Sequence, residues 1–212
     1  MSLLRPSITQ DIDQRLEGQG VYLRHPVMAD YKAWSDLRSQ SREFLKPWEP
    51  IWPKDDLTKA GFRRRLRRYA RDRRDGKSHS FLLFKSETDD LLGGLTLSNI
   101  RRGVSQSVTL GYWMGVSFAG RGFMSKAVEL IQPFCFEALG LHRIEAACLP
   151  HNAPSLRLLE KAGFVREGYA RNYLLINGYW QDHLLLACLA EDHAAGKNPA
   201  PMTIGGNLKE FL

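Results

Sequence analysis

A change in the pattern of apolar residues near Gly120 constrains the fold of this chain more than any other feature. Before it, apolar runs at Ser80 to Lys85, Leu91 to Asn99 and Val108 to Met114 are separated by short polar segments. Short runs that are rich in β-branched and aromatic residues and bounded by polar turns are typical of strands. The part of the chain before Gly120 therefore predicts an antiparallel meander.

After Gly120, predicted helices alternate with predicted strands. Apolar spacing predicts a helix over Gly120 to Leu139, a strand over Arg143 to Leu149, and a second helix over Ala153 to Ala162. Asn177-Gly178 separates two further apolar runs, and this dipeptide favours the two positive φ angles of a tight type I′ hairpin turn. Together the two parts predict an α+β fold in which helices pack on a mixed sheet.

The segment before the meander predicts a strand, a helix and an aromatic loop. Gly20 to Arg24 is typical of a strand, and Asp30 is expected to cap a helix that begins at Tyr31. Phe44 to Pro53 (FLKPWEPIWP) contains three prolines and two tryptophans, which interrupt regular structure. This loop either plugs the core or faces a substrate, and the sequence leaves both alternatives open.

Chain length predicts one domain. At about 150 residues per domain, 212 residues favour a single domain over 1–212. We expect its core at about 20–190, with a peripheral leader (1–19) and tail (191–212).

Composition indicates a cytoplasmic protein without a metal or disulfide framework. The longest unbroken apolar stretch, Leu184 to Ala190, is far shorter than the ~20 residues of a membrane-spanning helix. Met1 to Gln10 lacks the apolar block of a signal peptide. The three cysteines, Cys135, Cys148 and Cys188, are odd in number and widely spaced, so we expect buried free thiols.

Positive charge is concentrated in one predicted helix. The chain carries a net charge of +7, and eight arginines fall between Arg63 and Arg74, with apolar residues at helical spacing among them. Such a helix is either simply solvated or an electrostatic dock for nucleic acid or an acidic partner. The arginines expected to make such a contact are Arg63, Arg64, Arg67, Arg68 and Arg71.

A glycine turn precedes the helix after the meander. Gly120 and Gly122 flank Arg121, and a helix N-terminus offers free N–H groups to a phosphate or pyrophosphate. A nucleotide triphosphatase is disfavoured, because Arg121-Gly122 stands where a P-loop requires Lys-Ser or Lys-Thr. A dinucleotide fingerprint also fails, because the third glycine is missing.

The segment Asn152 to Phe164 (NAPSLRLLEKAGF), combined with the glycine turn, resembles the GNAT acetyltransferase family. Four further stretches are similar to the ribosomal-protein-alanine N-acetyltransferases of the RimJ/RimL type: FLKPWEP (44–50), HRI (142–144), PHN (150–152) and EGYARNYLLINGYWQDH (167–183). The resemblance covers roughly Val21 to Leu189. It implies a mixed sheet with a splayed strand pair, flanked by helices, and acetyl-CoA as cosubstrate without a metal.

The resemblance also implies a set of residues that bind acetyl-CoA. It places pantetheine on a splayed strand at Trp113 to Val116 and the pyrophosphate on the turn from Gly120 to Ser125. The residues implied are Trp113, Met114, Gly115, Val116, Gly120, Arg121, Gly122, Phe123, Met124, Ser125, Asn152 and Ser155. Ser117 departs from the Gln or Arg that usually begins this loop, which weakens the expectation for one phosphate contact.

The resemblance implies Ser155 as the group that protonates the departing thiolate, although Asn152 and Ser155 are also typical helix-capping residues. Relatives carry a glutamate base before the last hairpin turn, where this chain has Leu174 and Leu175. In the absence of that glutamate, we expect Glu49 to act as the general base. His151 and Asp182 are the alternatives, with Asp182 favoured as a structural acceptor. The residues expected to line the substrate mouth are Trp48, Trp52 and Tyr173.

The leading functional hypothesis is acetyl transfer from acetyl-CoA to an N-terminal alanine of a small-subunit ribosomal protein, by direct attack in a ternary complex. A contact of the arginine-rich helix with the ribosome or rRNA follows from such a client, and no membrane partner is expected. One alternative is a ribosome-assembly or RNA-associated binding factor. The other is acetylation of a small-molecule amine, which an arginine-rich chain disfavours when the amine is cationic.

Overall fold

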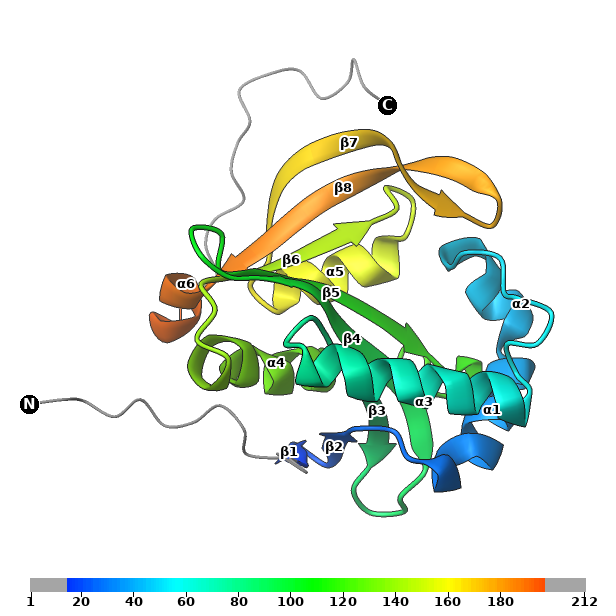
Figure 1. Ribbon diagram of the computed structural model, residues 1–212. Helices are drawn as coiled ribbons and strands as arrows, with labels where there is room; N and C mark the ends of the chain where they lie inside the picture. Colours follow the sequence, from blue (N-terminus) through cyan, green and yellow to red (C-terminus); the bar gives the residue numbers. More distant parts are fainter. Residues whose placement is uncertain (1–14, 197–212) are drawn as a thin grey trace, which may run out of the picture.

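A computed structural model describes residues 15–196, which build one mixed eight-stranded sheet in the order β1-β2-β3-β4-β5-β6-β8-β7 (Figure 1). Neighbouring strands are antiparallel except β5 and β6, which are parallel. The strands are β1 (Leu16–Gly18), β2 (Val21–Arg24), β3 (His79–Lys85), β4 (Leu91–Arg101), β5 (Ser107–Met114), β6 (Arg143–Cys148), β7 (Val165–Ile176) and β8 (Tyr179–Leu189).

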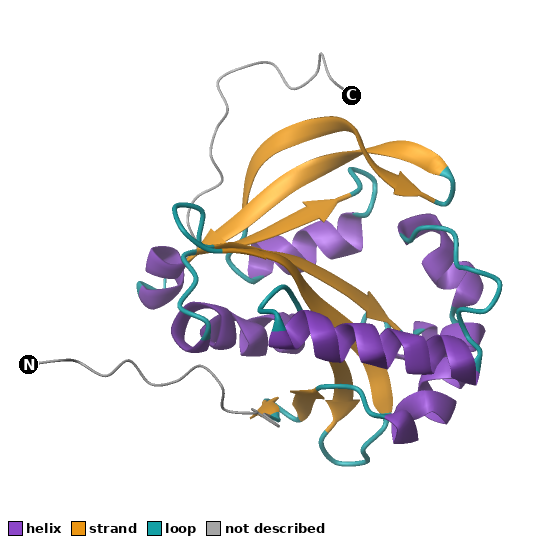
Figure 2. Ribbon diagram, in the orientation of Figure 1, coloured by secondary structure: helices purple, strands orange, loops and turns teal. Residues whose placement is uncertain are grey.

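Helices cover both faces of the sheet (Figure 2). They are α1 (Tyr31–Gln40), α2 (Arg42–Leu45), α3 (Lys59–Arg74), α4 (Phe123–Pro133), α5 (Ala153–Lys161) and α6 (Ala190–Ala194). A π-helical turn, Phe134–Ala138, extends α4. The described part of the chain has no helix with the length and apolar character needed to cross a membrane.

Two apolar clusters distinguish the two faces. The first joins strand residues to α4 and α5, for example Leu110 and Leu186 to Ile131 and Leu159. We call this the α4/α5 face. The second cluster packs the opposite side of β2, β3 and β4 against α1 and α3 through Trp34, Leu37 and Phe62. We call this the α1/α3 face. Because side chains alternate along a strand, the face of each strand residue follows from its position.

The predicted α+β class and the mixed sheet are confirmed, and so is the hairpin turn, in which Asn177 and Gly178 have φ angles of 47° and 87°. The first predicted helix does begin at Tyr31, but the cap expected from Asp30 and the start of the later helix are wrong. Asp30 does not cap α1 with its side chain, because its Oδ2 accepts from the Val27 N–H at 2.7 Å. The helix expected from Gly120 begins at Phe123, because Gly120 and Gly122 adopt left-handed φ angles of 74° and 79°.

The parallel strands β5 and β6 pair over three residues and then separate. Ser107, Val108 and Thr109 pair with β6, but β5 continues beside β4 to Met114 while β6 continues beside β8 to Cys148. The predicted splayed pair is therefore present. The strands open a gap in the middle of the sheet, and the backbone groups along the gap lack a neighbouring strand.

Candidate active site

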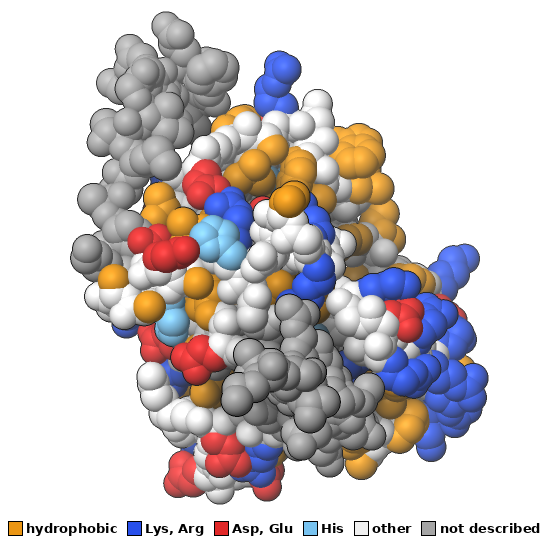
Figure 3. Space-filling model, turned by 60° about the vertical axis from the view of Figure 1, so that its left-hand side comes forward, with side chains coloured by type: hydrophobic (Ala, Val, Ile, Leu, Met, Phe, Trp, Pro, Cys, Tyr) orange, Lys and Arg blue, Asp and Glu red, His pale blue; other side chains and the backbone are white. Residues whose placement is uncertain are grey.

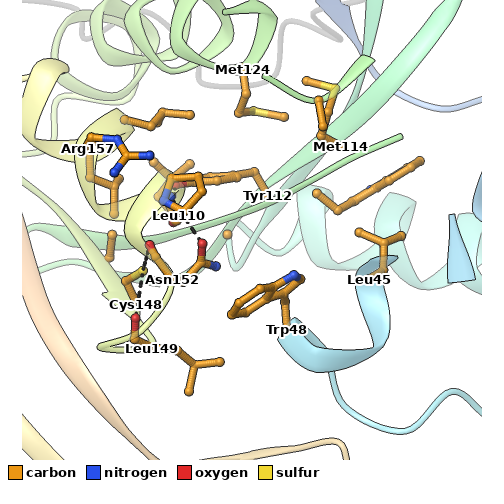
Figure 4. A pocket seen from close by; sticks show the side chains of 18 of the residues that line it. Leu45, Trp48, Leu110, Tyr112, Met114, Met124, Cys148, Leu149, Asn152 and Arg157 are labelled. Atoms are coloured by element: carbon orange, nitrogen blue, oxygen red, sulfur yellow. Dashed lines mark hydrogen bonds between the residues drawn. The ribbon is translucent and has the colours of Figure 1, made fainter. Parts of the chain in front are cut away.

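A cavity of about 600 Å³ occupies this gap and is lined from both faces of the sheet. On the α4/α5 face its walls include Tyr112 and Ser155, and from the other side the loop after α2 contributes Trp48 and Glu49. Trp48 points into the cavity across from Asn152 (Figure 4). The cavity therefore offers two separate approaches to one point between the strands.

Strand β5 directs alternate backbone groups at the gap. The Gly115 N–H donates to the Leu92 carbonyl of β4 at 2.8 Å, so Trp113, two residues earlier, also faces β4. Leu110, Tyr112 and Met114 consequently face the gap. The prediction that Trp113 to Val116 form the splayed strand is thus right for Trp113 and Met114, although only Met114 turns its backbone groups to the gap, and wrong for Gly115 and Val116.

Gly115 and Val116 lie beyond the strand and outside the cavity. Val116 begins a 3₁₀ turn, and its N–H donates to the Ser41 hydroxyl at 3.0 Å. Neither residue lines the cavity, whereas the Trp113 side chain does. Both amides are engaged within the protein and are not free to bind a ligand.

The glycine turn leads into the cavity at the N-terminus of α4. The left-handed Gly122 is the N-cap and provides no side-chain cap, so the first-turn N–H groups of Phe123, Met124 and Ser125 lack an internal partner. Gly120, Gly122 and these three residues line the cavity, whereas Arg121 is exposed outside it. Uncapped amides at a helix N-terminus suit a phosphate group, which fits the pyrophosphate of acetyl-CoA.

Ser155 is held by a neighbour that the sequence did not indicate. Its Oγ lies 2.7 Å from the Tyr112 Oη, and burial raises the pKa of that phenol well above its ordinary value. Asn152 Oδ1 accepts from the Ser155 N–H at 3.3 Å, so Asn152 does cap α5. The capping leaves the amide group of Asn152 free to donate. Ser155 and Tyr112 therefore form a neutral hydroxyl pair on the cavity wall.

Cys148 also lines the cavity but has the character of a structural thiol. It is buried, and burial raises the pKa of its thiol. A protonated thiol is a poor nucleophile, so the site favours direct attack on a thioester over an acetyl-cysteine intermediate. As predicted, all three cysteines are free and buried.

Glu49 is bound by two partners in the aromatic loop. Arg38 donates from Nη1 and Nη2 to the two carboxylate oxygens, each at 2.7 Å, and Trp52 Nε1 donates to Oε2 at 2.7 Å. The Arg38 guanidinium also lies over the rings of Trp52 and Trp113. These contacts argue against Glu49 as the base. They also correct the prediction for Trp52, which holds Glu49 and does not line the cavity.

The mouth of the cavity lies between the aromatic loop and the tip of the β7-β8 hairpin. The Asn177 N–H donates to the Glu49 carbonyl at 2.9 Å, which ties the two segments together. Trp48 lines the cavity as predicted and contacts the exposed ring of His151. Tyr173 is exposed and not part of the lining, but its ring packs edge-on against His183.

His183 lies in the cavity wall, and the sequence did not indicate it as a site residue. Its neighbour Asp182 accepts hydrogen bonds from the Tyr169 hydroxyl and the Asn172 N–H, which is the structural role predicted for it. His183 itself lines the cavity from β8. The sequence signal for it is a polar residue next to the apolar run that begins at Leu184.

The arginines of α3 lie on the outer side of that helix. Arg63, Arg64, Arg67, Arg68 and Arg71 are all exposed, and Lys and Arg side chains gather at the right of Figure 3. Arg64 forms an ion pair with Asp55. Within residues 15–196, no group of three or more His, Cys, Asp and Glu side chains could hold a metal ion.

Comparison with known families gives a match over most of the sheet. A family model described as "Acetyltransferase (GNAT) domain" matches residues 21–165. This range includes the aromatic loop, the splayed strands, the glycine turn and α5.

Individual relatives are also N-acetyltransferases by name. The "Probable N-acetyltransferase YjcK" of Bacillus subtilis is 37% identical over 84% of this chain and 98% of that protein. The "[Ribosomal protein uS5]-alanine N-acetyltransferase" of Escherichia coli is 35% identical over 81% of this chain and 89% of that protein. Mycobacterium smegmatis RimJ, solved in complex with CoA-disulfide, has a TM-score of 0.77 and 34% identity, with 83% of this chain and 89% of that chain covered.

Proposed function

Because the chain belongs to the GNAT acetyltransferase family, which uses acetyl-CoA, we propose that it acetylates the N-terminal α-amine of a protein. The expected substrate is an N-terminal alanine of a small-subunit ribosomal protein, the kind of substrate named for the Escherichia coli relative. A substrate on the ribosome would place the reaction in the cytoplasm. The observation that carries the proposal is the cavity between β5 and β6, which is lined from both faces of the sheet.

The two approaches to the cavity support a separate approach for each substrate. On the α4/α5 face, the free amides of Phe123, Met124 and Ser125 would hold the pyrophosphate. The unpaired backbone of β5 and the Asn152 amide would bind pantetheine, and Met114 offers a free N–H to polarise the thioester carbonyl. The amine would then approach from the side of Trp48.

Charge in the cavity favours an α-amine over a polyamine or lysine. Its charged lining residues are Glu49, which Arg38 neutralises, together with Arg157 and Lys161. Both cations lie on α5, on the side assigned to acetyl-CoA, and the lining within residues 15–196 offers no free carboxylate to attract a polycation. An α-amine has a pKa of ~7.8 and is about one-seventh neutral at pH 7, whereas lysine at ~10.4 is almost fully charged. The site therefore suits an amine that needs little help to lose its charge.

Steady-state acetyl transfer to a panel of peptides tests this proposal. Peptides with free N-terminal Ala, Ser or Met are compared with a blocked peptide that contains lysine and with spermidine, and products are identified by mass spectrometry. We expect transfer to the free α-amines, with Ala preferred, and none to the blocked peptide. Preferred acetylation of spermidine would replace the proposal with a small-molecule function, and binding of acetyl-CoA without any transfer would favour a binding factor.

For the ribosomal partner, we propose that the exposed arginines of α3 contact rRNA phosphates. Positions 63, 67 and 71 form one row along the helix, with about 6 Å of rise between neighbours. A second row contains Arg64 and Arg68, and within residues 15–196 acidic partners are found for Arg64 and Arg71 but not for Arg63 or Arg67. Unpaired guanidinium groups at this spacing suit a polyphosphate backbone.

Salt dependence of RNA binding tests this contact. If the helix neutralises about four phosphates of a labelled RNA hairpin, a plot of the logarithm of the association constant against the logarithm of the salt concentration should have a slope near −3. The triple variant Arg63→Gln/Arg67→Gln/Arg71→Gln should weaken binding and flatten the slope. A control variant, Lys32→Gln/Lys85→Gln/Arg166→Gln, removes the same charge from α1, β3 and β7. Equal losses in both variants would show that net charge, and not α3, governs binding.

A further inference from the structure

We infer that His183 is the general base of the acetyl transfer, accepting the proton that the attacking amine loses; this inference rests on the proposed function. The residue lies on β8 in the wall of the cavity between the splayed strands. Within the described part of the chain, the one carboxylate that lines the cavity is not free for this role, since both oxygens of Glu49 are engaged by Arg38 and one also by Trp52. Among the lining residues within 15–196, His183 is the one with an imidazole, whose ordinary pKa suits a general base.

Strand alternation places His183 on the side from which the amine approaches. Leu184 and Leu186 pack into the cluster on the α4/α5 face, so His183 points to the opposite face. The cosubstrate groups Tyr112 and Ser155 lie on the α4/α5 face. His183 and Ser155 thus border one cavity from opposite faces of the sheet, as an acceptor and a donor of protons should.

One hydrogen bond fixes the tautomer of the His183 ring. Nδ1 lies 2.9 Å from the Gln181 carbonyl oxygen, which can only accept, so Nδ1 carries the proton. Nε2 is then the unprotonated nitrogen. Within residues 15–196 it makes no hydrogen bond, although the side chain is 97% buried, with 3% exposed. An unpaired lone pair in a cavity wall is ready to accept a proton from a ligand.

Burial lowers the pKa of His183 below its ordinary value, so the imidazole is neutral at pH 7. Several ionisable groups surround it or share its cavity. They are Asp182 on β8, Tyr173 on β7, Cys148 on β6, Glu49 in the aromatic loop, and Arg157 and Lys161 on α5. Asp182 raises the pKa and is itself bound by Tyr169 and Asn172, while desolvation has the larger effect.

The chemistry of the intermediate explains why a base is needed. After attack, the nitrogen carries an extra proton, and an amine of pKa ~7.8 leaves at least as readily as a thiolate of pKa ~8.5. Transfer of that proton to Nε2 prevents the return of the amine. The C–N bond forms, the C–S bond breaks, the thiolate takes up one proton, and the imidazolium releases its proton to solvent. The products are one amide and one thiol.

The variant His183→Asn tests the assignment. Asparagine can keep a donor near the position of Nδ1 for the Gln181 carbonyl but has no counterpart of Nε2. We expect kcat/KM for an Ala-terminal peptide to fall about 100-fold, while acetyl-CoA affinity and Tm stay at wild-type values. His142→Asn, on the exposed side chain that pairs with Glu191, is the matched control and should retain full activity.

The pH profile of the wild-type protein provides a test without any variant. Two groups, the amine and His183, must be deprotonated, so log kcat/KM should rise with a slope of two below the pKa of His183 and with a slope of one between the two pKa values. His183→Asn should show a slope of one throughout. A wild-type slope of one at all acidic pH values, or full activity of His183→Asn, would overturn the assignment. Absence of transfer to any α-amine by the wild-type protein would instead overturn the proposed function.

Discussion

Replacement of Ser155 by alanine should lower kcat for acetyl transfer by about 100-fold, with little change in the KM for acetyl-CoA. The Ser155 hydroxyl lies in the cavity wall, where it can donate to the sulfur as negative charge develops on the leaving thiolate. This interaction exists only in the transition state, so its loss appears in kcat and not in substrate binding. Steady-state rates of CoA thiol release, measured over a range of acetyl-CoA concentrations, give kcat and KM separately.

Tyr112→Phe should produce a smaller loss through the same route. Because burial keeps the Tyr112 phenol protonated, it can donate to Ser155 Oγ and leave the serine proton directed at the cavity. Tyr112 thus acts as a positioning residue. The double variant Tyr112→Phe/Ser155→Ala should be no slower than Ser155→Ala alone, since Tyr112 acts only through the Ser155 hydroxyl. Additive losses would contradict this pairing, and Ser98→Ala, at a site on β4 away from the cavity, serves as control.

The second large effect concerns stability. Arg38→Met should lower the free energy of unfolding by about 3 kcal/mol, because it leaves the Glu49 carboxylate largely buried without its charged partner. The arginine is 6% exposed and also packs between Trp52 and Trp113. Urea denaturation measures the change, and an unchanged m value would show that the unfolded state is not the cause.

The double variant Arg38→Met/Glu49→Leu separates the structural role of Glu49 from a catalytic one. Replacing both charges by apolar groups should restore most of the lost stability. It should also retain acetyl transfer, because His183 and not Glu49 is the inferred base. A double variant with wild-type stability but no transfer would return the role of base to Glu49.

Local signals made much of the fold predictable from the sequence. Strand and helix periods identified the meander, α4 and α5, and Asn177-Gly178 identified the hairpin. The start of α4 was misplaced by three residues, because periodicity does not show that Gly120 and Gly122 adopt left-handed conformations. The resemblance to a family, and not periodicity, predicted the splay between β5 and β6.

The candidate site was predictable only in part, because its contacts join residues distant in sequence. Ser155 and the turn at Gly120 were identified from motifs, but the bond from Ser155 to Tyr112 spans 43 positions. The engagement of Glu49 by Arg38 depends on how α1 packs under the aromatic loop. The register of β5 with β4 decides which backbone groups of β5 face the gap. The Gly115 N–H is bonded to β4 and the Val116 N–H to Ser41, so neither faces the cavity.

The most direct test of the central claim is a competition within one peptide. A peptide with a free N-terminal alanine and an internal lysine is incubated with acetyl-CoA and the protein, and tandem mass spectrometry locates the acetyl group. A cavity that supplies only a weak neutral base should place the acetyl group on the α-amine, since lysine is almost fully charged at pH 7. Acetylation mainly on the lysine Nζ would contradict the account.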